Sequence, residues 1–169
     1  MPVNIVVDVE SDGPCPGLYS MISLGAVVVK PPFDQTFFMQ AAPVGEFYDD
    51  EALAVSGITH EEHLIYPDAM GGTLKFFGWL QSLGDKPVMW SDNPAYDWQW
   101  VNYYLHRYAK KNPLGWSARR IGDLYCGVKG DLRARWKHLR TTAHTHHPVD
   151  DAKGNAEALW KVMGMMGKA

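Results

Sequence analysis

The sequence predicts an α/β fold in which a mixed β-sheet is flanked by helices. Three observations support this prediction. Apolar, β-branched segments near the N-terminus are separated by short turns rich in glycine and proline, as in an antiparallel meander. Farther along, segments with helical spacing alternate with short apolar runs. The 169 residues, 46% hydrophobic and 21% charged, suffice for one globular domain with a substantial core.

Three strands form the predicted meander. The first, residues 4–10, is apolar and β-branched and ends at the turn Ser11-Asp12-Gly13-Pro14. The second spans residues 21–29 and ends at Pro31-Pro32, and the third spans residues 36–40. Because the connections are short, consecutive strands are expected to pair as antiparallel neighbours.

Helices and further strands are expected after an acidic, glycine-punctuated region that ends near Thr59. Apolar residues at helical intervals predict the helices, and short apolar runs predict strands that complete the sheet in parallel. In chain order these elements are a helix over 68–83, a strand over 86–90, a helix over 96–108, a short strand entering a helix over 120–125, and a last helix from about Asp150.

The chain shows none of the features of a membrane or secreted protein. No apolar run approaches the roughly 20 residues that span a membrane. The N-terminus lacks a charged region of the kind that opens a signal peptide, so none is expected. The two cysteines, Cys15 and Cys126, have no zinc or redox spacing. We therefore expect a reducing, cytoplasmic location.

Charge is distributed unevenly along the chain, whose net charge is −3. Residues 107–140 carry ten Lys and Arg against two acids, whereas the remaining residues carry six against seventeen. An acidic body with one basic segment suits a polyanion bound beside a metal site. The alternative is a solvated surface of helices and loops.

Asp8 and Glu10 lie two residues apart in the first predicted strand. Side chains alternate across a strand, so both carboxylates project from one face, roughly 7 Å apart. Two anions in apolar surroundings repel each other and lose hydration unless a cation or a proton compensates. The pair is therefore a candidate divalent-metal site, although the spacing also arises by chance.

Two more carboxylates stand out in the predicted helices. Asp97 shares helical phase with Val101 and Leu105, which puts it on the core-facing side. A buried hydrogen bond to the backbone, or the helix dipole, is the structural alternative. Asp151 lies in the first turn of the last helix, where Asp150 is the more natural N-cap.

Three histidines fall within the segment His144–His147, just before Asp151. A zinc cluster is one interpretation, but no cysteine accompanies them. The four acids offer only oxygen ligands, which favours Mg²⁺ or Mn²⁺, and two such ions suit phosphodiester hydrolysis. An adjacent histidine of this segment is suited to accept the proton of the attacking water.

These residues fall in an order that resembles the DEDD superfamily of 3′–5′ exonucleases, histidine subtype, which includes proofreading exonucleases, ribonuclease T and oligoribonuclease. The resemblance covers about residues 3–165 and is strongest to small, stand-alone bacterial and phage exonucleases. The three matching motifs are Val7-Asp8-Val9-Glu10-Ser11-Asp12-Gly13, Asn93-Pro94-Ala95-Tyr96-Asp97-Trp98 and His146-His147-Pro148-Val149-Asp150-Asp151-Ala152.

The resemblance implies a ribonuclease H-like fold and a single exonuclease domain over residues 1–169. The implied activity trims the 3′ end of single-stranded nucleic acid to nucleoside 5′-monophosphates, with RNA slightly favoured over DNA. Implied ligands of two divalent cations, Mg²⁺ or Mn²⁺, are Asp8, Glu10, Asp97 and Asp151, with His146 as general base. Implied substrate contacts are Tyr96, Trp98, Asn93 and the backbone of Ser11, Asp12 and Gly13.

Some positions depart from the family pattern. Asp92 stands where the family often has a histidine, and it adds a negative charge near an anionic substrate. Ser56 stands in place of another family histidine. The register of the third motif is also open, because His147 is four residues from Asp151 whereas His146 has the family's spacing of five.

Two other functions are kept as alternatives. One is a non-catalytic nucleic-acid-binding module on the same fold, which is expected to lack at least one of the acids. The other is a phosphodiesterase for short oligonucleotides. Near the second motif, Trp90, Trp100, Tyr103 and Tyr104 are expected in the core. A homodimer is left open, because the apolar tail at 163–166 suits either an interface or a frayed end.

Overall fold

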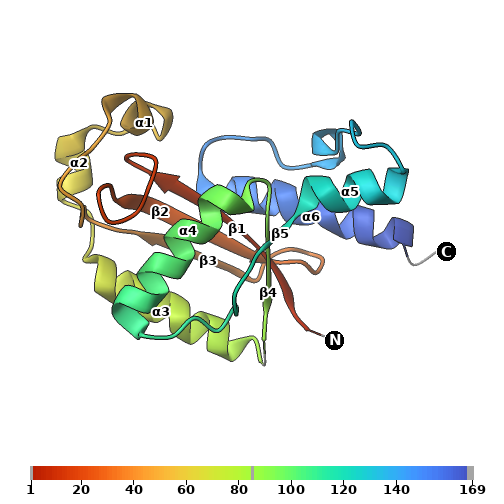
Figure 1. The fold of residues 1–169 in the computed structure, drawn as a ribbon, viewed down its shortest axis with the longest axis horizontal. Helices are drawn as coiled ribbons and strands as arrows, with labels where there is room; N and C mark the ends of the chain where they lie inside the picture. Colours follow the sequence, from red (N-terminus) through yellow and green to blue (C-terminus); the bar gives the residue numbers. More distant parts are fainter. Residues whose placement is uncertain (1, 85, 167–169) are drawn as a thin grey trace.

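The computed structural model, which describes residues 2–84 and 86–166, contains a five-stranded sheet between two layers of helices (Figure 1). The strands are β1 (Asn4–Ser11), β2 (Met21–Val28), β3 (Thr36–Gln40), β4 (Val88–Ser91) and β5 (Arg119–Arg120). Their order across the sheet is β3-β2-β1-β4-β5. Pairing is antiparallel from β1 to β2 and from β2 to β3, and parallel from β1 to β4 and from β4 to β5. The predicted meander with added parallel strands is confirmed.

Local sequence signals explain where several helices begin. Thr59 and Glu62 form a capping box at the start of α2, and Asp68 caps α3. Pro94 and Pro148 open α4 and α6, where the amide that proline lacks would have no helical partner. The helices are α1 (Asp50–Val55), α2 (His60–Leu64), α3 (Ala69–Ser82), α4 (Pro94–Tyr104), the π-helix η1 (Leu105–Ala109), α5 (Ile121–Lys129), the 3₁₀-helix η2 (Lys137–Leu139) and α6 (Pro148–Met166).

The observed elements differ from the expected ones in a few places. Helices α1, α2 and η2 occupy regions where no regular structure is expected from the sequence. The last helix begins at Pro148, so Asp150 lies inside its first turn and the prediction of Asp150 as N-cap is wrong. Within residues 2–84 and 86–166, no helix is long and apolar enough to cross a membrane.

Two hydrophobic cores lie on opposite faces of the sheet. On one face, Ile5, Val7 and Val9 of β1 pack with residues of α3 and α4. On the other face, Val6 packs with residues of α5 and α6. Because side chains alternate along a strand, the acids at positions 8 and 10 share the face of Val6 and point toward α6. The sheet thus presents both carboxylates to one helix.

Candidate active site

Three carboxylates converge where β1 ends and α6 begins. Asp8 and Glu10 come from β1, and Asp151 comes from the first turn of α6, where it is 1% exposed. Each offers an oxygen atom within 4.8 Å of those of the other two. We call these three residues the carboxylate cluster. The structure therefore brings together acids that the sequence places at opposite ends of the chain.

A glycine in the neighbouring strand lets α6 approach the sheet this closely. Gly25 in β2 is paired with Asp8 across the antiparallel ladder. A Cβ added at Gly25 would lie 2.3 Å from the carbonyl carbon of Pro148, the first residue of α6. A side chain at this position would push the first turn of α6, and with it Asp151, away from Asp8.

Asp97 reaches the end of β1 from α4. Its side chain is 4% exposed, so the predicted core-facing position is confirmed. The Val9 amide donates a hydrogen bond to its Oδ1 at 3.0 Å, and the Ser91 hydroxyl donates to its Oδ2. The buried backbone hydrogen bond considered as the structural alternative is therefore also present. Within the residues that the structure describes, Asp97 lies outside the 4.8 Å group formed by the carboxylate cluster.

The surroundings of these acids oppose their ionisation. Burial, followed by the charges of Asp97 and Glu10, raises the pKa of Asp8 well above its usual range. Burial raises the pKa of Asp97 to about 7, even though the hydrogen bonds from Ser91 and Val9 favour the charged form. The charges of Asp8 and Asp97 are therefore costly to hold together without a cation.

Neighbouring groups partly oppose the rise in the pKa of Glu10. Burial raises its pKa, while nearby His146 and the hydroxyl of Ser56 oppose the rise. The Ser56 hydroxyl donates to Glu10 Oε2 at 3.3 Å. The serine that replaces a family histidine thus contacts a carboxylate of the site.

The loop before α6 is folded around the carboxylate of Asp151. The amides of Thr145 and His146 donate to its Oδ1 and Oδ2 at 3.0 and 3.1 Å. His146 has a φ of 61°, a left-handed conformation that few residues other than glycine adopt. Successive amides that converge on one anion in this way fix its orientation. Strained backbone of this kind concentrates at functional sites.

Two histidines of this loop face different ways. His146 lies close enough to Glu10 to oppose the rise of its pKa. The ring of His147 instead stacks on Phe38, with ring centroids 5.0 Å apart. Of the two registers left open by the sequence, the structure puts His146 beside the acids.

A third histidine, His144, lies next to the same aspartate. Its Nδ1 is 2.8 Å from Asp151 Oδ1, and its ring lies 4.3 Å from that of His146. These three residues also offer ligand atoms within 4.8 Å of one another. The zinc alternative therefore has a geometric basis, although it shares Asp151 with the carboxylate cluster.

Ser11 and Tyr96 meet through their hydroxyl groups at the end of β1. The Ser11 hydroxyl also contacts the Gly13 carbonyl oxygen at 2.6 Å. Burial raises the pKa of Tyr96 to about 12, so its phenol stays neutral at physiological pH. The half-buried Tyr96 ring packs edge-on against Trp100 at 6.3 Å.

Asp12, which the resemblance predicts to contact the substrate through its backbone, is buried in the loop after β1. It is 0% exposed, its amide donates to the Ser20 carbonyl at 2.9 Å, and its carbonyl accepts from the Asp49 amide at 2.8 Å. Its carboxylate accepts from the Ser20 amide and lies 3.4 Å from Nδ1 of buried His63. Through its amide, its carbonyl and one carboxylate oxygen, Asp12 holds the loop after β1 in place.

The remaining predicted contacts are dispersed. Gly13 is buried, and a Cβ there would lie 1.9 Å from the ring of Tyr19, so a glycine at this position lets the Tyr19 ring pack against the backbone. Trp98 lines a hollow with Pro16 and other residues of α4 and η1, and none of the carboxylate cluster lines it. Asn93 is exposed at the residue before α4, where its side chain makes no capping bond.

The negative charge of Asp92 is offset by cations. Lys137 Nζ lies 2.7 Å from its carboxylate, and Arg120 Nε donates to its carbonyl oxygen at 3.1 Å. Asp92 therefore adds an ion pair and not an unbalanced charge beside the site.

The predicted basic segment does not form one surface. Its first part, residues 107–111, begins within η1 and continues just beyond it, roughly 20 Å from the start of α4 by helical rise. Its second part, residues 119–140, includes β5, α5 and the loop to η2, on the other side of β4 from β1. Of the two parts, we propose that the second is the one that contacts a strand bound at the carboxylate cluster.

Two positioning residues were not found from the sequence. Arg140 stacks on Trp136 at 5.3 Å, and its charge opposes the rise in the pKa of Asp8. The carboxylate of Glu157 accepts the amides of Thr141 and Thr142, each at 2.8 Å, and so anchors the loop that carries His146. Such long-range contacts leave no local sequence signal.

The donors of the site suit hard divalent cations. The carboxylate cluster offers only oxygen ligands, the type that Mg²⁺ and Mn²⁺ prefer. The raised pKa values of Asp8, Glu10 and Asp97 mark a place where positive charge would be stabilised. The residues present therefore fit a divalent-metal centre.

Comparisons with known proteins find nucleases that are similar to this chain. No family model matches the chain. The 3′–5′ DNA exonuclease Cap18 of Escherichia coli is 33% identical over 161 residues, which cover 93% of this chain and 84% of Cap18. Cell-death related nuclease 4 aligns over 98% of the chain with a TM-score of 0.75 at 14% identity. E. coli exonuclease I bound to a dA16 oligonucleotide aligns over 92% with a TM-score of 0.69 at 16% identity.

The chain spans 64% of cell-death related nuclease 4 and 39% of exonuclease I, so these similarities describe a shared domain. A ribonuclease H-like sheet with acids on β1, α4 and α6 defines a DEDD-type exonuclease. The identity with Cap18 shows that the chain belongs to this superfamily of 3′–5′ exonucleases, in the family of Cap18. It is an enzyme of the nuclease class.

Proposed function

We propose that the chain hydrolyses single-stranded DNA from the 3′ end and releases nucleoside 5′-monophosphates. The observation that carries this proposal is the carboxylate cluster, with Asp97 and His146 beside it. Support for the polarity and for DNA comes from the relative Cap18, which is named a 3′–5′ DNA exonuclease. 

In this proposal Asp8, Glu10, Asp97 and Asp151 hold two divalent cations, Mg²⁺ or Mn²⁺. Such ions, when bound, activate a water molecule and stabilise the attacking and leaving oxygens of the phosphodiester. The protein keeps the four acids together and orients them. The amides of Thr145 and His146 donate to the two oxygens of Asp151, and the Val9 amide and the Ser91 hydroxyl donate to those of Asp97.

His146 is proposed as the general base. It accepts the proton of the attacking water on a ring nitrogen and passes it to solvent. Its exposed ring, beside Glu10 on the loop before α6, supports this role. Imidazole is suited to the task because its ordinary pKa lies near neutral pH.

Tyr96, Ser11 and Asn93 are proposed to bind the terminal nucleotide. The phenol oxygen of Tyr96, whose proton is donated to Ser11, can accept from a sugar hydroxyl, and its partly exposed ring can pack on the nucleoside. Stacking of this kind contributes about 1–3 kcal/mol per base and tolerates any sequence. Exposed Asn93 offers an amide at the start of α4.

The slight preference for RNA expected from the sequence remains untested. Discrimination depends on contacts to the 2′-hydroxyl. The relative at 33% identity is named for DNA, and exonuclease I was crystallised with a deoxyoligonucleotide. We therefore propose DNA as the preferred substrate.

The test is a trimming assay on matched 5′-labelled DNA and RNA 24-mers with Mg²⁺, Mn²⁺ or EDTA. We expect a ladder of DNA products that shortens from the 3′ end, slower trimming of RNA, and no products in EDTA. Chromatography should identify nucleoside 5′-monophosphates. Release of the 5′ label as a mononucleotide before any shortening, or products with 3′-phosphates, would refute the proposal.

A further inference from the structure

A basic groove of about 700 Å³ lies beside the start of α4. It extends between the residues that follow β4, the first turn of α5 and the loop that leads to η2. We call this hollow the basic groove. It is lined by Asp92, Asn93, Arg120, Gly122, Asp123, Cys126, Leu132, Arg133, Ala134, Arg135, Trp136 and Lys137.

The charges of the basic groove leave a surplus of cations. Both of its acids are paired, since Asp92 lies 2.7 Å from Lys137 and Asp123 lies 3.4 Å from Arg120. Arg133 and Arg135 are exposed, and among the described residues neither has an ion-pair partner. Two guanidinium groups with free donors in a hollow suit phosphate oxygens.

The backbone of the groove adds to this preference. Arg120 occupies the N-cap position of α5, and no side chain caps this helix. Residues 122 and 123 of its first turn line the groove, so the amide end of a nine-residue helix opens into it. Unpaired amides and the helix dipole both favour an anion here.

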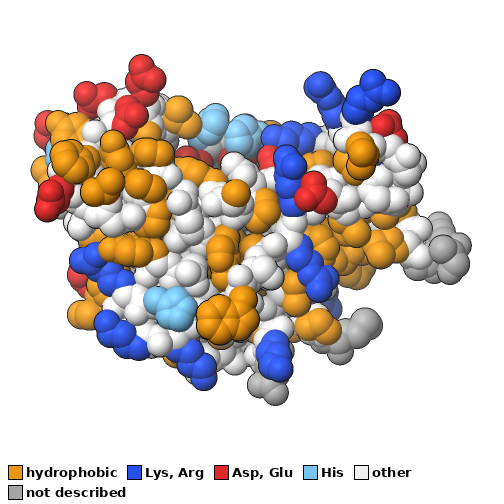
Figure 2. All heavy atoms as spheres, in the orientation of Figure 1, with side chains coloured by type: hydrophobic (Ala, Val, Ile, Leu, Met, Phe, Trp, Pro, Cys, Tyr) orange, Lys and Arg blue, Asp and Glu red, His pale blue; other side chains and the backbone are white. Residues whose placement is uncertain are grey.

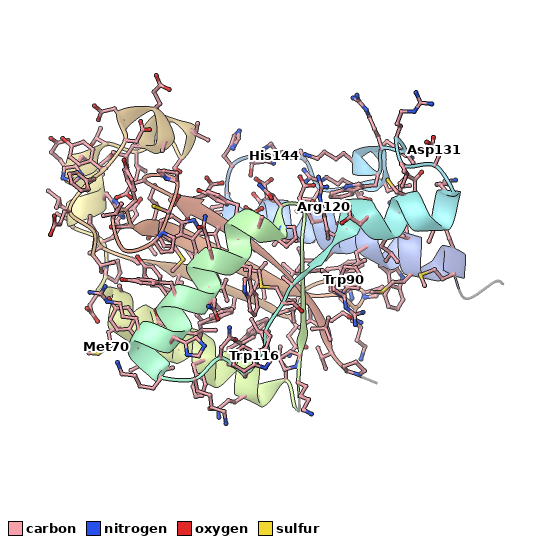
Figure 3. The ribbon with its side chains drawn as sticks, viewed as in Figure 1. Met70, Trp90, Trp116, Arg120, Asp131 and His144 are labelled. Atoms are coloured by element: carbon pink, nitrogen blue, oxygen red, sulfur yellow. The ribbon has the colours of Figure 1, made fainter. Side chains whose placement is uncertain are left out.

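The basic groove lies close to the carboxylate cluster. Arg120 is the last residue of β5, which lies two strands from β1, so the groove begins about 10 Å from the cluster. Figure 3 shows Arg120 at the junction of β5 and α5, with His144 in the loop before α6. This distance suits the nucleotides just upstream of a 3′ end held at the cluster.

The opposite flank repels a polyanion. Helices α1 and α2 lie beside the cluster, as the bond from Ser56 to Glu10 shows. Acidic side chains gather over these helices in Figure 2, whereas Lys and Arg gather over α5 and the loop to η2. The acids of this flank are Asp49, Asp50, Glu51, Glu61 and Glu62. A bound strand is therefore steered away from α1 and α2.

We propose that the basic groove binds the sugar-phosphate backbone of the substrate strand upstream of its terminal nucleotide, through Arg133 and Arg135. This inference rests on the proposed exonuclease function and defines the path of the strand. It predicts that the groove acts only on substrates long enough to reach it. A dinucleotide, with its single phosphodiester at the cluster, gains nothing from these arginines.

The test compares the double variant Arg133→Ala/Arg135→Ala with the wild-type protein. The matched control is Lys75→Ala/Lys111→Ala, which removes the same charge from exposed positions on α3 and beyond η1. Trimming of a single-stranded 24-mer and of a dinucleotide is measured in Mg²⁺. Binding of the labelled 24-mer is measured separately by fluorescence anisotropy in EDTA over a range of salt concentrations.

We expect the groove variant to lose about tenfold or more in kcat/KM on the 24-mer, mainly through KM, because each lost phosphate contact weakens binding. On the dinucleotide it should match the wild type within twofold. The slope of log Kd against log salt should fall by about 1.4, since single strands release roughly 0.7 counterion per contact. The lysine control should behave as the wild type on both substrates.

Failure of the inference and failure of the proposed function give different results. Equal 24-mer trimming and an equal salt slope in the wild type and the groove variant would overturn the inference while leaving the exonuclease intact. A wild-type protein that degrades neither substrate would overturn the proposed function. The anisotropy measurement in EDTA still decides whether the groove binds nucleic acid in that case.

Discussion

Asp8 is the residue on which the electrostatics of the site converge. Burial and the charges of Asp97 and Glu10 raise its pKa, and only Arg140 opposes them among the causes identified. The folded chain therefore holds a like-charged group together at a cost in stability. A bound cation removes that cost. We therefore expect Asp8 to be required for activity while it lowers the stability of the metal-free protein.

Asp8→Asn should lower activity and raise the stability of the metal-free protein. Activity should fall more than about 100-fold, since even residues that only orient metal ligands contribute 10–100-fold. In EDTA at pH 8 the variant should melt above the wild type, by about 2–4 °C for each kcal/mol of repulsion relieved. Asp34→Asn, at an exposed position, is the control and should change neither quantity. An unchanged rate together with an unchanged melting temperature would contradict this view of Asp8.

The two adjacent histidines allow a second test at the same scale. His146→Ala should slow hydrolysis by about 10²–10⁴, the usual contribution of a general base. His147→Ala loses only the stack on Phe38 and should stay within a few-fold of the wild type. Equal loss in both variants would mean that the loop, and not the imidazole of His146, matters. Rates at saturating Mg²⁺ are the measurement.

At the residue scale, the four acids and His146 could be predicted from short motifs, in which polar residues stand at positions where the surrounding pattern favours apolar ones. Asp12 looked like part of the substrate site for the same reason, yet it is buried against His63. The sequence around Asp12 and the sequence around His63 carry no signal that predicts this contact. Arg140 was counted only as the end of a basic segment, because its approach to Asp8 exists only after folding.

Among the elements, α6 depends on β2 for its position. The Cβ position of Gly25 is filled by the backbone of Pro148, at 2.3 Å. Asp151 lies one turn farther on, so the geometry of the carboxylate cluster depends on a glycine that makes no contact with substrate. The sequence showed this glycine only as part of a strand.

Gly25→Ala should therefore damage both stability and activity. Forcing a methyl group into a packed interface costs about 1–3 kcal/mol, and the shift of α6 should weaken metal binding. The matched control is Gly78→Ala on α3, where a Cβ meets no neighbour within 4 Å. That change should be neutral or stabilise by up to about 1 kcal/mol. Thermal melts and Mn²⁺ titrations measure the two effects, and parallel behaviour of the two variants would refute the account.

Element boundaries were predictable where the pattern was long enough. The strands at 4–11 and 36–40 and the helix at 69–82 follow the expected periodicities closely. Helices α1 and α2, with six and five residues, are too short to show a helical repeat. Their existence rests on capping bonds and tertiary packing, which composition alone does not reveal.

On the scale of the whole molecule, stability is linked to pH and to metal. Asp97 has a pKa of about 7 in the folded chain, above the ordinary value of about 3.9 for aspartate. Between these values the folded state holds a proton that the unfolded state has released. Stability therefore falls as pH rises through this window, by up to about 1.4 kcal/mol per pH unit for one group.

A melting series from pH 5 to pH 8 tests this linkage. Without metal, the melting temperature should fall as pH rises. With Mg²⁺ the fall should be smaller, so the increase in melting temperature on adding Mg²⁺ should grow with pH. Asp97→Asn should flatten the metal-free curve. A metal-free protein that gains stability from pH 5 to pH 8 would show that these acids do not govern its titration.

The most direct test of the central claim is the location of Mn²⁺ in a soaked crystal, by anomalous scattering at the manganese edge. We expect two peaks in the space bounded by Asp8, Glu10, Asp97 and Asp151. A single peak among His144, His146 and Asp151, or no peak beside Asp8 in crystals that bind Mn²⁺ elsewhere, would refute the proposed two-metal centre.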